Sequence, residues 1–350
     1  MKAAVFHAKE DLRVENVEEP TVEAGQVKLK NAFAGICGSD LHVYYAPEAA
    51  GLTLDEPHPV TGAQLPQILG HEFAGTVVEV GEGVEGVSVG DRAAVWPVYY
   101  CGECPACEKG MFNACQKIGF HGLSSHGGGM AEYTTVPASM LHKLPENVDL
   151  RMGALVEPMA VAWHAVERSH VTSGQTAIVA GAGPIGIGVW FALKAHGVEK
   201  VLVSEPSAAR RETIAALGAT VVDPVSGDLA AAVAELTGGR GADVAFDAAG
   251  AGPAITSGLA SLVPGGRLVV VAIHERAMEF SPTQLVMAET EIAGALAYLP
   301  ADFDAVIDAM SRGVYDTTGW VEEVPIDGVV GAIEKLRGGA GAKILVRSDA

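Results

Sequence analysis

Three side chains of types that bind zinc stand out in the first half of the chain. Cys37 belongs to the segment 35–42, where a thiol, a hydroxyl, a carboxylate and an imidazole occur within six residues. His71 lies in a second polar segment, 69–75, and Glu157 interrupts an otherwise apolar stretch. Cysteine, histidine and glutamate suit a catalytic zinc whose fourth position is left for water or substrate. Such a zinc is a Lewis acid that lowers the pKa of a bound alcohol.

Spacing alone does not bring these three residues together, because they are far apart in the sequence. A buried free cysteine, a core histidine and a glutamate at a helix end are ordinary features of globular proteins, and each residue taken singly fits such a role. Two further histidines, His121 and His126, lie in a glycine-rich segment, and they either line a pocket or belong to simple turns. The catalytic-zinc hypothesis therefore depends on other signals.

A second metal-binding pattern is much tighter. Four of the five cysteines occur within fifteen residues, at Cys101, Cys104, Cys107 and Cys115. Four thiolates at this spacing favour one tetrahedral structural zinc with every position filled by sulfur. Two disulfides are the alternative, but two-residue gaps strain disulfide geometry, and nothing else in the sequence indicates a secreted protein. A closed site of this kind does no chemistry, so the reaction must take place elsewhere.

A third pattern lies in the second half of the chain. The apolar run Thr176–Ala180 predicts a strand, and a helical stretch to His196 follows it. The residues between them read Gly181, Ala182, Gly183, Pro184, Ile185 and Gly186. This is the dinucleotide-binding fingerprint in its expected context. The glycines make the turn and let a pyrophosphate approach the backbone, while the N–H groups of the helix hold the phosphates.

A second strand, Lys200–Ser204, ends at Glu205, nineteen residues after Gly186. The carboxylate of Glu205 would accept hydrogen bonds from the adenosine ribose and repel a 2′-phosphate, so NAD is favoured over NADP. Arg210 follows soon after and either lines the adenosine end or is a solvated charge on a helix face. Because ligands bind at the carboxyl ends of strands in doubly wound sheets, three more residues are expected at the nicotinamide: Ala249, Ala272 and Ile273.

Two kinds of structure are predicted to position these residues. Residues 1–155 carry short alternating strands and turns rich in valine and glycine, as in a compact β domain. Residues 156–297 alternate between strands and helices, as in a doubly wound parallel sheet of the α/β class. A helix near 303–310 and a strand near 343–346 are expected to rejoin the first domain, so residues 298–350 are assigned to it.

The composition limits the possible partners. A chain of 350 residues with 49% hydrophobic residues can form two domains with sizeable cores. The net charge of −20 argues against nucleic acid or an anionic membrane, because both repel an acidic surface. The first residues carry charge where a signal peptide needs an apolar run, and glycine and proline break the longest apolar stretch, 176–193. A cytoplasmic location is expected.

In combination, Cys37, the Gly-His-Glu of residues 70–72, the four-cysteine segment and the dinucleotide fingerprint resemble the zinc-containing medium-chain dehydrogenase/reductase family. The resemblance covers essentially the whole chain. It implies a GroES-like, β-rich catalytic domain, a Rossmann domain that binds NAD, and two zinc ions per subunit. It also implies that Cys37, His71 and Glu157 are the catalytic-zinc ligands, the third of which is Cys or Glu within the family.

The resemblance further implies roles for neighbours of the ligands. Ser39 would take the proton of the alcohol and His42 would pass it toward solvent, since a proton released at the metal must be drained. Asp40 would orient His71. Glu72 would be a carboxylate able to approach the metal during ligand exchange.

Three segments, 58–75, 118–133 and 153–166, are similar to the 2,3-butanediol dehydrogenase branch of the (R,R) type. This similarity implies NAD-linked interconversion of a vicinal diol and acetoin. Sorbitol and threonine dehydrogenases share the metal pattern and remain alternatives, as do a non-catalytic NAD-binding sensor and a scaffold protein. The family resemblance suggests a homodimer or homotetramer, with sheets pairing through an edge at 267–273.

Overall fold

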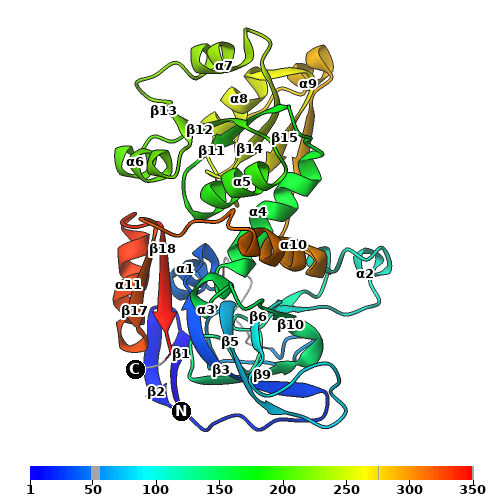
Figure 1. Cartoon of the computed structure of the whole chain (residues 1–350), viewed down its shortest axis with the longest axis vertical. Helices are drawn as coiled ribbons and strands as arrows, with labels where there is room; N and C mark the ends of the chain where they lie inside the picture. The colour runs from blue at the N-terminus through cyan, green and yellow to red at the C-terminus, as the bar shows by residue number, and fades with distance from the viewer. Residues whose placement is uncertain (49–55, 275, 349–350) are drawn as a thin grey trace. The chain divides into compact units, whose positions relative to one another are not determined.

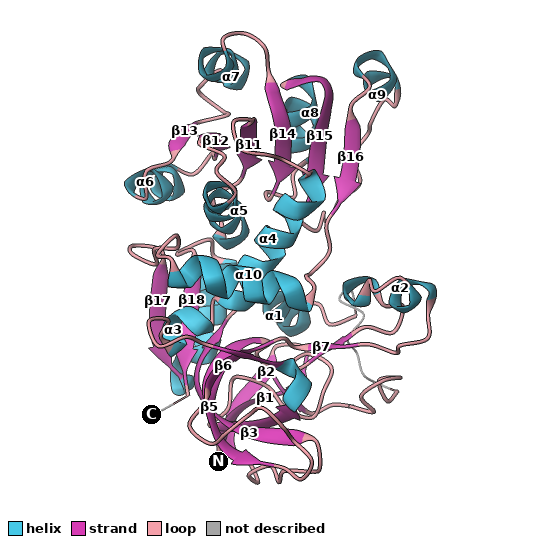
Figure 2. Cartoon of the chain, turned by 45° about the vertical axis from the view of Figure 1, so that its right-hand side comes forward, coloured by secondary structure: helices cyan, strands magenta, loops and turns pink. Residues whose placement is uncertain are grey.

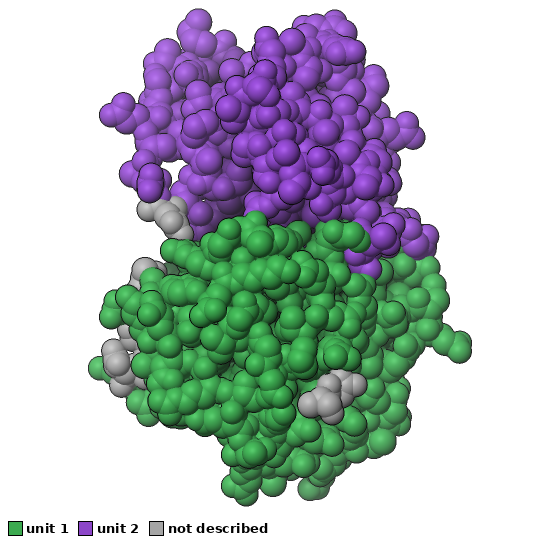
Figure 3. Space-filling view, turned by 90° about the vertical axis from the view of Figure 1, so that its left-hand side faces the viewer, with its two compact units in different colours: residues 1–157, 299–311, 319–350 green, residues 158–298, 312–318 purple. Residues whose placement is uncertain are grey.

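The computed structural model describes residues 1–48, 56–274 and 276–348, and the chain forms two compact units. Unit 1 consists of Met1–Glu157, Leu299–Ser311 and Gly319–Ala350, shown in green in Figure 3. Unit 2 consists of Pro158–Tyr298 and Arg312–Thr318, shown in purple. Each unit has its own sheet and core.

Unit 1 is built on a seven-stranded sheet in which β3 is the central strand (Figure 1). Strand β3 pairs antiparallel with β5, β9 and β18. Within the described residues, the members of this sheet are β3 (Gln26–Gly35), β5 (Glu72–Val80), β6 (Arg92–Val95), β9 (Tyr133–Pro137), β10 (Leu141–Lys143), β17 (Val321–Pro325) and β18 (Lys343–Arg347). A smaller sheet contains β1 (Lys2–Ala8), β2 (Asp11–Asn16) and β4 (Gln67–Ile68).

The core of unit 1 packs between these strands and helix α11 (Val329–Arg337). Phe6, Leu29 and Phe73 are fully or almost fully buried there, beside Ile333 from α11. Each such side chain contributes about 1.5–3 kcal/mol of burial free energy. The strands that carry the polar residues of the candidate site are therefore held by an apolar core.

Helix α1 (Gly38–Tyr45) begins directly after Cys37. The side chain of Asp40 accepts a hydrogen bond from the backbone N–H of Cys37 at 2.8 Å, which caps the first turn. Val43 and Tyr44 are buried and anchor the helix to the core. The cap and these buried side chains hold the Cys37 thiol at the N-terminus of α1, where the helix dipole favours negative charge.

Unit 2 has a parallel sheet with the strand order β13-β12-β11-β14-β15-β16, which is the doubly wound order of a Rossmann domain (Figure 2). In the described residues the strands are β11 (Thr176–Ala180), β12 (Lys200–Ser204), β13 (Thr220–Val222), β14 (Ala242–Asp247), β15 (Leu262–Val270) and β16 (Glu291–Gly294). The helices are α4 (Val156–Ser169), which begins in unit 1, α5 (Pro184–Ala195), α6 (Ala208–Ala216), α7 (Leu229–Thr237), α8 (Gly252–Ala260) and α9 (Thr283–Ala288). The expected fold class is confirmed.

One expectation about this sheet is wrong. The segment 267–273, expected to form an edge of the sheet, begins within β15, which ends at Val270 and lies between β14 and β16. Within β15 the pairing with β14 shifts register, and Gly265 adopts a left-handed backbone conformation with a φ of +76°. The open edge of the sheet on this side is β16.

Among the residues described above, no helix is both long enough and apolar enough to cross a membrane.

Candidate metal and cofactor sites

Cys37 and His71 lie close together in unit 1. Cys37 follows the end of β3, and His71 and Glu72 lie at the start of β5, which pairs with β3. One ligand atom from each of Cys37, His71 and Glu72 lies within 4.8 Å of the other two. His71 and Glu72 are buried and Cys37 is half-buried. The sheet pairing therefore brings together residues that spacing alone could not connect.

The imidazole of His71 lies between two polar groups of α1. Its Nε2 atom is 3.3 Å from the Ser39 hydroxyl, and its Nδ1 atom is 3.8 Å from Oδ1 of Asp40. Within the described residues, neither Nδ1 nor Oδ1 has a hydrogen-bond partner, although both atoms are buried. A histidine bound to a metal through Nε2 commonly donates Nδ1–H to a carboxylate. The arrangement fits zinc and agrees with the orienting role expected for Asp40.

Charge in this site also favours a cation. Burial, together with the charge of Glu72, raises the pKa of the Cys37 thiol to about 12. Burial likewise raises the pKa of the Asp40 carboxyl. A thiolate at Cys37 therefore needs a compensating positive charge, which a bound zinc ion supplies because it deprotonates its thiol ligands.

Lys343 is a residue of this site that the sequence analysis missed. It is the first residue of β18, only 2% exposed, and its ammonium donates hydrogen bonds to Glu72 and to the backbone oxygen of Ile36, the latter at 2.9 Å. Burial lowers the pKa of Lys343, but Glu72 and Cys37 outweigh this effect and the net shift is upward. The available signal was a lysine directly before the apolar residues Ile344, Leu345 and Val346 of β18.

Glu157 is buried near the start of α4, but it is not part of the cluster of ligand atoms within 4.8 Å. Its negative charge nevertheless acts on Lys343 and contributes to raising the pKa of that residue. The structure therefore places two buried carboxylates, Glu72 and Glu157, around one lysine beside Cys37.

The proposed proton pathway lies on α1. Ser39 and His42 are three residues apart, a spacing that puts both side chains on one face of a helix. Ser39 faces His71, while His42 is partly exposed. A route from the site toward solvent along this face is geometrically reasonable.

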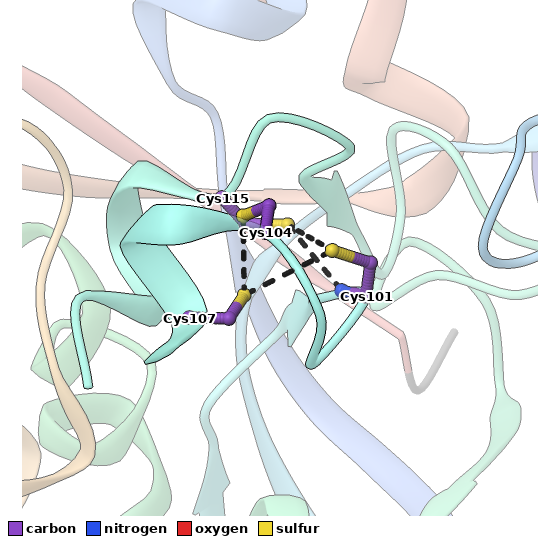
Figure 4. Close-up of side chains that lie close together, drawn as sticks. All are labelled: Cys101, Cys104, Cys107 and Cys115. Atoms are coloured by element: carbon purple, nitrogen blue, oxygen red, sulfur yellow. Dashed lines mark hydrogen bonds between the residues drawn. The ribbon is translucent and has the colours of Figure 1, made fainter. Parts of the chain in front are cut away.

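The four cysteines of the second motif converge in a small lobe around α2 (Pro105–Glu108), shown in Figure 4. Their sulfur atoms are 3.5 Å apart for Cys115 and Cys101, 3.6 Å for Cys104 and Cys107, and 4.0 Å for Cys101 and Cys107. All four thiols are free, so the structure contains neither of the alternative disulfides. A tetrahedron with zinc–sulfur bonds of about 2.3 Å has sulfur–sulfur edges of about 3.8 Å. The quartet fits one zinc ion.

We expect Cys104→Ser to prevent zinc binding by this quartet and to lower the melting temperature. Cys104 accepts hydrogen bonds from the backbone of Gln116 and Cys107, which lower its pKa to about 6 and favour a thiolate. Loss of one sulfur breaks the closed site and its contribution to folding. Elemental analysis and thermal unfolding measure both effects. Wild-type zinc content and melting temperature in this variant would contradict the assignment.

The glycine-rich turn of unit 2 connects β11 to α5. Gly181 has a φ of +101°, a left-handed conformation that favours glycine, and a side chain at Gly186 would overlap the backbone oxygen of Gly181. Gly183 caps α5, and nothing lies within 4 Å of the position its Cβ would occupy. Pro184 and Ile185 form the first turn of the helix. This geometry leaves open backbone at a helix N-terminus, as a pyrophosphate requires.

Glu205 follows β12 and is bound to this turn. Its Oε2 atom accepts the N–H of Ala182 at 2.7 Å and its Oε1 atom accepts the N–H of Ser207 at 2.8 Å. A carboxylate has about four acceptor positions, so these bonds leave capacity for a ribose hydroxyl. Arg210 is partly exposed on α6, whereas the guanidinium of Arg211 binds the backbone oxygen of Glu205.

The carboxyl ends of β14 and β15 are organised by Asp247, which is almost completely buried. Oδ1 of Asp247 accepts N–H groups of Ala249 and Gly250, and Oδ2 lies 2.6 Å from Nε2 of His274. Ala249 and Ile273 are exposed, and Ala272 is half-buried. All three residues expected at the cofactor therefore follow the carboxyl ends of β14 and β15, where doubly wound sheets bind ligands.

The fold and these sites define an oxidoreductase with a GroES-like unit and a Rossmann unit. Two family models match the chain: the alcohol dehydrogenase GroES-like domain over residues 23–146 and the zinc-binding dehydrogenase domain over residues 184–312. The chain belongs to the zinc-binding dehydrogenase family of alcohol dehydrogenases. The resemblance found in the sequence is thereby confirmed.

Relatives of known activity are similar over the full length. The chain is 40% identical to an (R,R)-butanediol dehydrogenase of Bacillus subtilis, with 100% of both proteins covered. It is also 40% identical to a 2-dehydro-3-deoxy-L-galactonate 5-dehydrogenase of Pseudoalteromonas atlantica, covering 100% of the chain and 99% of the relative. The crystal structure of 2R,3R-butanediol dehydrogenase from Bacillus subtilis superposes with a TM-score of 0.91 over 99% of each chain, at 40% identity.

Proposed function

We propose that this protein interconverts a vicinal diol and a hydroxyketone with NAD, with (R,R)-2,3-butanediol and acetoin as the preferred pair. The observation that carries the proposal is the full-length similarity to a butanediol dehydrogenase combined with the clustering of Cys37 and His71 beside Ser39. A sugar-acid substrate is the second candidate, because a relative of that activity is equally identical. Lys343 already pairs with Glu72, so an uncharged diol fits this site better than a carboxylate.

The proposed metal content is two zinc ions per chain. Cys37, His71 and Glu157 would hold one, with Glu72 beside them, and the four cysteines of the lobe would hold the other. Zinc at the first site would polarise the substrate hydroxyl, and the nicotinamide would accept hydride from the substrate carbon.

The other steps belong to side chains of this protein. Oγ of Ser39 accepts the proton of the alcohol as it gives up its own hydroxyl proton, which His42 takes up and releases to solvent. Asp40 fixes the ring of His71 so that Nε2 faces the site. Glu205 accepts the adenosine ribose hydroxyls and excludes a 2′-phosphate, which supports NAD rather than NADP. The five free thiols are consistent with the proposed cytoplasmic location.

A substrate panel tests the proposal. Initial rates of NADH and NADPH formation would be measured with the three 2,3-butanediol stereoisomers, sorbitol, threonine and a simple secondary alcohol, and the reverse rate with acetoin. Oxidation of the sugar acid 2-dehydro-3-deoxy-L-galactonate would be measured in parallel. We expect the highest kcat/KM for (R,R)-butanediol with NAD. A higher kcat/KM for the sugar acid, sorbitol or threonine would show that this compound, and not butanediol, is the preferred substrate. Absence of turnover with zinc and NAD bound would favour the hypothesis of a non-catalytic NAD-binding sensor.

We also propose that the protein is a homo-oligomer that associates through the β16 side of the unit 2 sheet. Strand β16 is the edge of that sheet, and apolar side chains near it are exposed: Val286 at 74%, Met287 at 80% and Ile292 at 39%. An exposed strand edge with apolar neighbours is a typical interaction surface.

Ile292→Glu is expected to shift the protein toward monomer, because a carboxylate would be buried in the interface. Size-exclusion chromatography with light scattering measures the mass. Val225→Glu is the matched control, since Val225 is 81% exposed next to β13 at the opposite edge of the same sheet. An unchanged mass for Ile292→Glu, or an equal shift for the control, would count against this interface.

A further inference from the structure

The pairing of Lys343 with Glu72 is unusual because both groups are almost fully removed from solvent. The side chains are 2% and 1% exposed. Lys343 is further held by the backbone oxygen of Ile36, the residue before Cys37. Charged groups this deeply buried require partners, so the position of each determines the position of the other.

The two oxygens of Glu72 have different surroundings. Oε2 binds the ammonium of Lys343, whereas Oε1 is buried and has no hydrogen-bond partner among the described residues. Glu72 also contributes an atom to the cluster with Cys37 and His71. The carboxylate therefore lies between a lysine on one side and the candidate zinc ligands on the other.

The backbone is shaped to admit this pair. A side chain at Gly35 would overlap Oε2 of Glu72 and would lie 2.9 Å from Cε of Lys343. Gly35 is the last residue of β3, directly opposite Glu72 in the pairing of β3 with β5. The absence of a side chain at this position is what allows the ion pair to form behind the cluster.

We propose that Lys343 is a positioning residue that restrains Glu72 and thereby keeps it from acting as a permanent ligand of the metal held by Cys37 and His71. This inference rests on the proposed zinc centre. Glu157, which lies outside the cluster of ligand atoms in this structure, would then supply the lasting carboxylate ligand, and the fixed charge of Lys343 would weaken the binding of the metal cation through like-charge repulsion. Lys343 thus keeps one coordination position exchangeable, as substrate binding requires.

The rate of zinc release tests this role without depending on turnover. Purified protein would be mixed with excess of a chromogenic chelator, and the phase that belongs to the catalytic site would be identified as the one missing from Cys37→Ser. We expect Lys343→Met to slow that phase about tenfold, and Glu72→Gln to accelerate it by a similar factor, the size typical of groups around metal ligands. In the double variant, the effect of Lys343→Met should fall to about twofold or less, because the freed carboxylate is gone.

Lys335→Met is the matched control, because Lys335 forms an exposed ion pair with Glu322 in the same unit. It should leave the release rate unchanged. Faster or unchanged zinc release in Lys343→Met would overturn the inference. If that variant does not fold, an unchanged rate in Glu72→Gln would overturn it as well. If Cys37→Ser removes no phase from the wild-type trace, the zinc centre itself is wrong, and this outcome is distinct from a failure of the role of Lys343.

Discussion

Cys37→Ser is expected to reduce kcat by about 10³-fold or more, because a Lewis-acid metal contributes several kcal/mol to transition-state stabilisation. The substitution removes the proposed sulfur ligand next to His71. NAD binding should stay within about twofold of wild type, because the dinucleotide fingerprint lies on other elements of the chain. This change separates the chemical step from cofactor binding.

The measurement combines steady-state kinetics, zinc content and titration with NADH. The variant should retain one zinc ion per chain, in the four-cysteine lobe. Cys104→Ser provides the contrast, since it should lose the other zinc ion and stability first. Turnover of Cys37→Ser at a rate near that of wild type would exclude Cys37 as a catalytic ligand.

The second large effect concerns acid stability and depends on His121. This residue is 2% exposed, with Nε2 at 2.7 Å from the Thr134 hydroxyl and Nδ1 at 3.1 Å from the Tyr99 hydroxyl. Burial lowers the pKa of His121 from 6.5 to about 3. Between these pH values the unfolded chain binds a proton that the folded chain does not. The stability contributed by neutral His121 is therefore complete above pH 6.5 and declines as the pH falls, by up to about 1.4 kcal/mol per pH unit.

His121→Asn should flatten the dependence of the unfolding free energy on pH between pH 6.5 and 4, while lowering its value at pH 7 by about 1–3 kcal/mol through lost hydrogen bonds. Denaturant titrations at several pH values give both quantities. His126→Asn is the control, because His126 is exposed in the same glycine-rich segment. Parallel pH curves for wild type and His121→Asn would show that His121 is not the residue responsible.

The sequence was most informative where a local pattern has one physical explanation. Alternating apolar runs and the glycine turn at Gly181 predicted the strands and helices of unit 2, because they depend on neighbouring residues. The irregular pairing of β15 around Gly265 was not predictable, since it depends on how β15 accommodates extra residues against β14. The edge strand was misplaced for the same reason, because strand order is a property of the whole sheet.

The candidate sites show the same division. The four-cysteine lobe could be predicted because its residues are close in sequence and chemically uniform. The role of Lys343 could not, because 271 residues separate it from Glu72 and only the pairing of β18 with β3 brings it into the site. The choice between Glu72 and Glu157 as the metal ligand likewise depends on this long-range contact.

The position of β18 in the chain also determines when the metal centre can form. Protein synthesis proceeds from the N-terminus, and domains fold as units as they emerge. The Pro158–Tyr298 segment of unit 2 is therefore translated in full before β18, one of the three described strands that pair with β3, exists. On the nascent chain, Cys37, His71 and Glu72 are present early, but the lysine that pairs with Glu72 is missing until β18 is synthesised. The proposed zinc centre can consequently be completed only after β18 has been synthesised, later than all of the Pro158–Tyr298 segment.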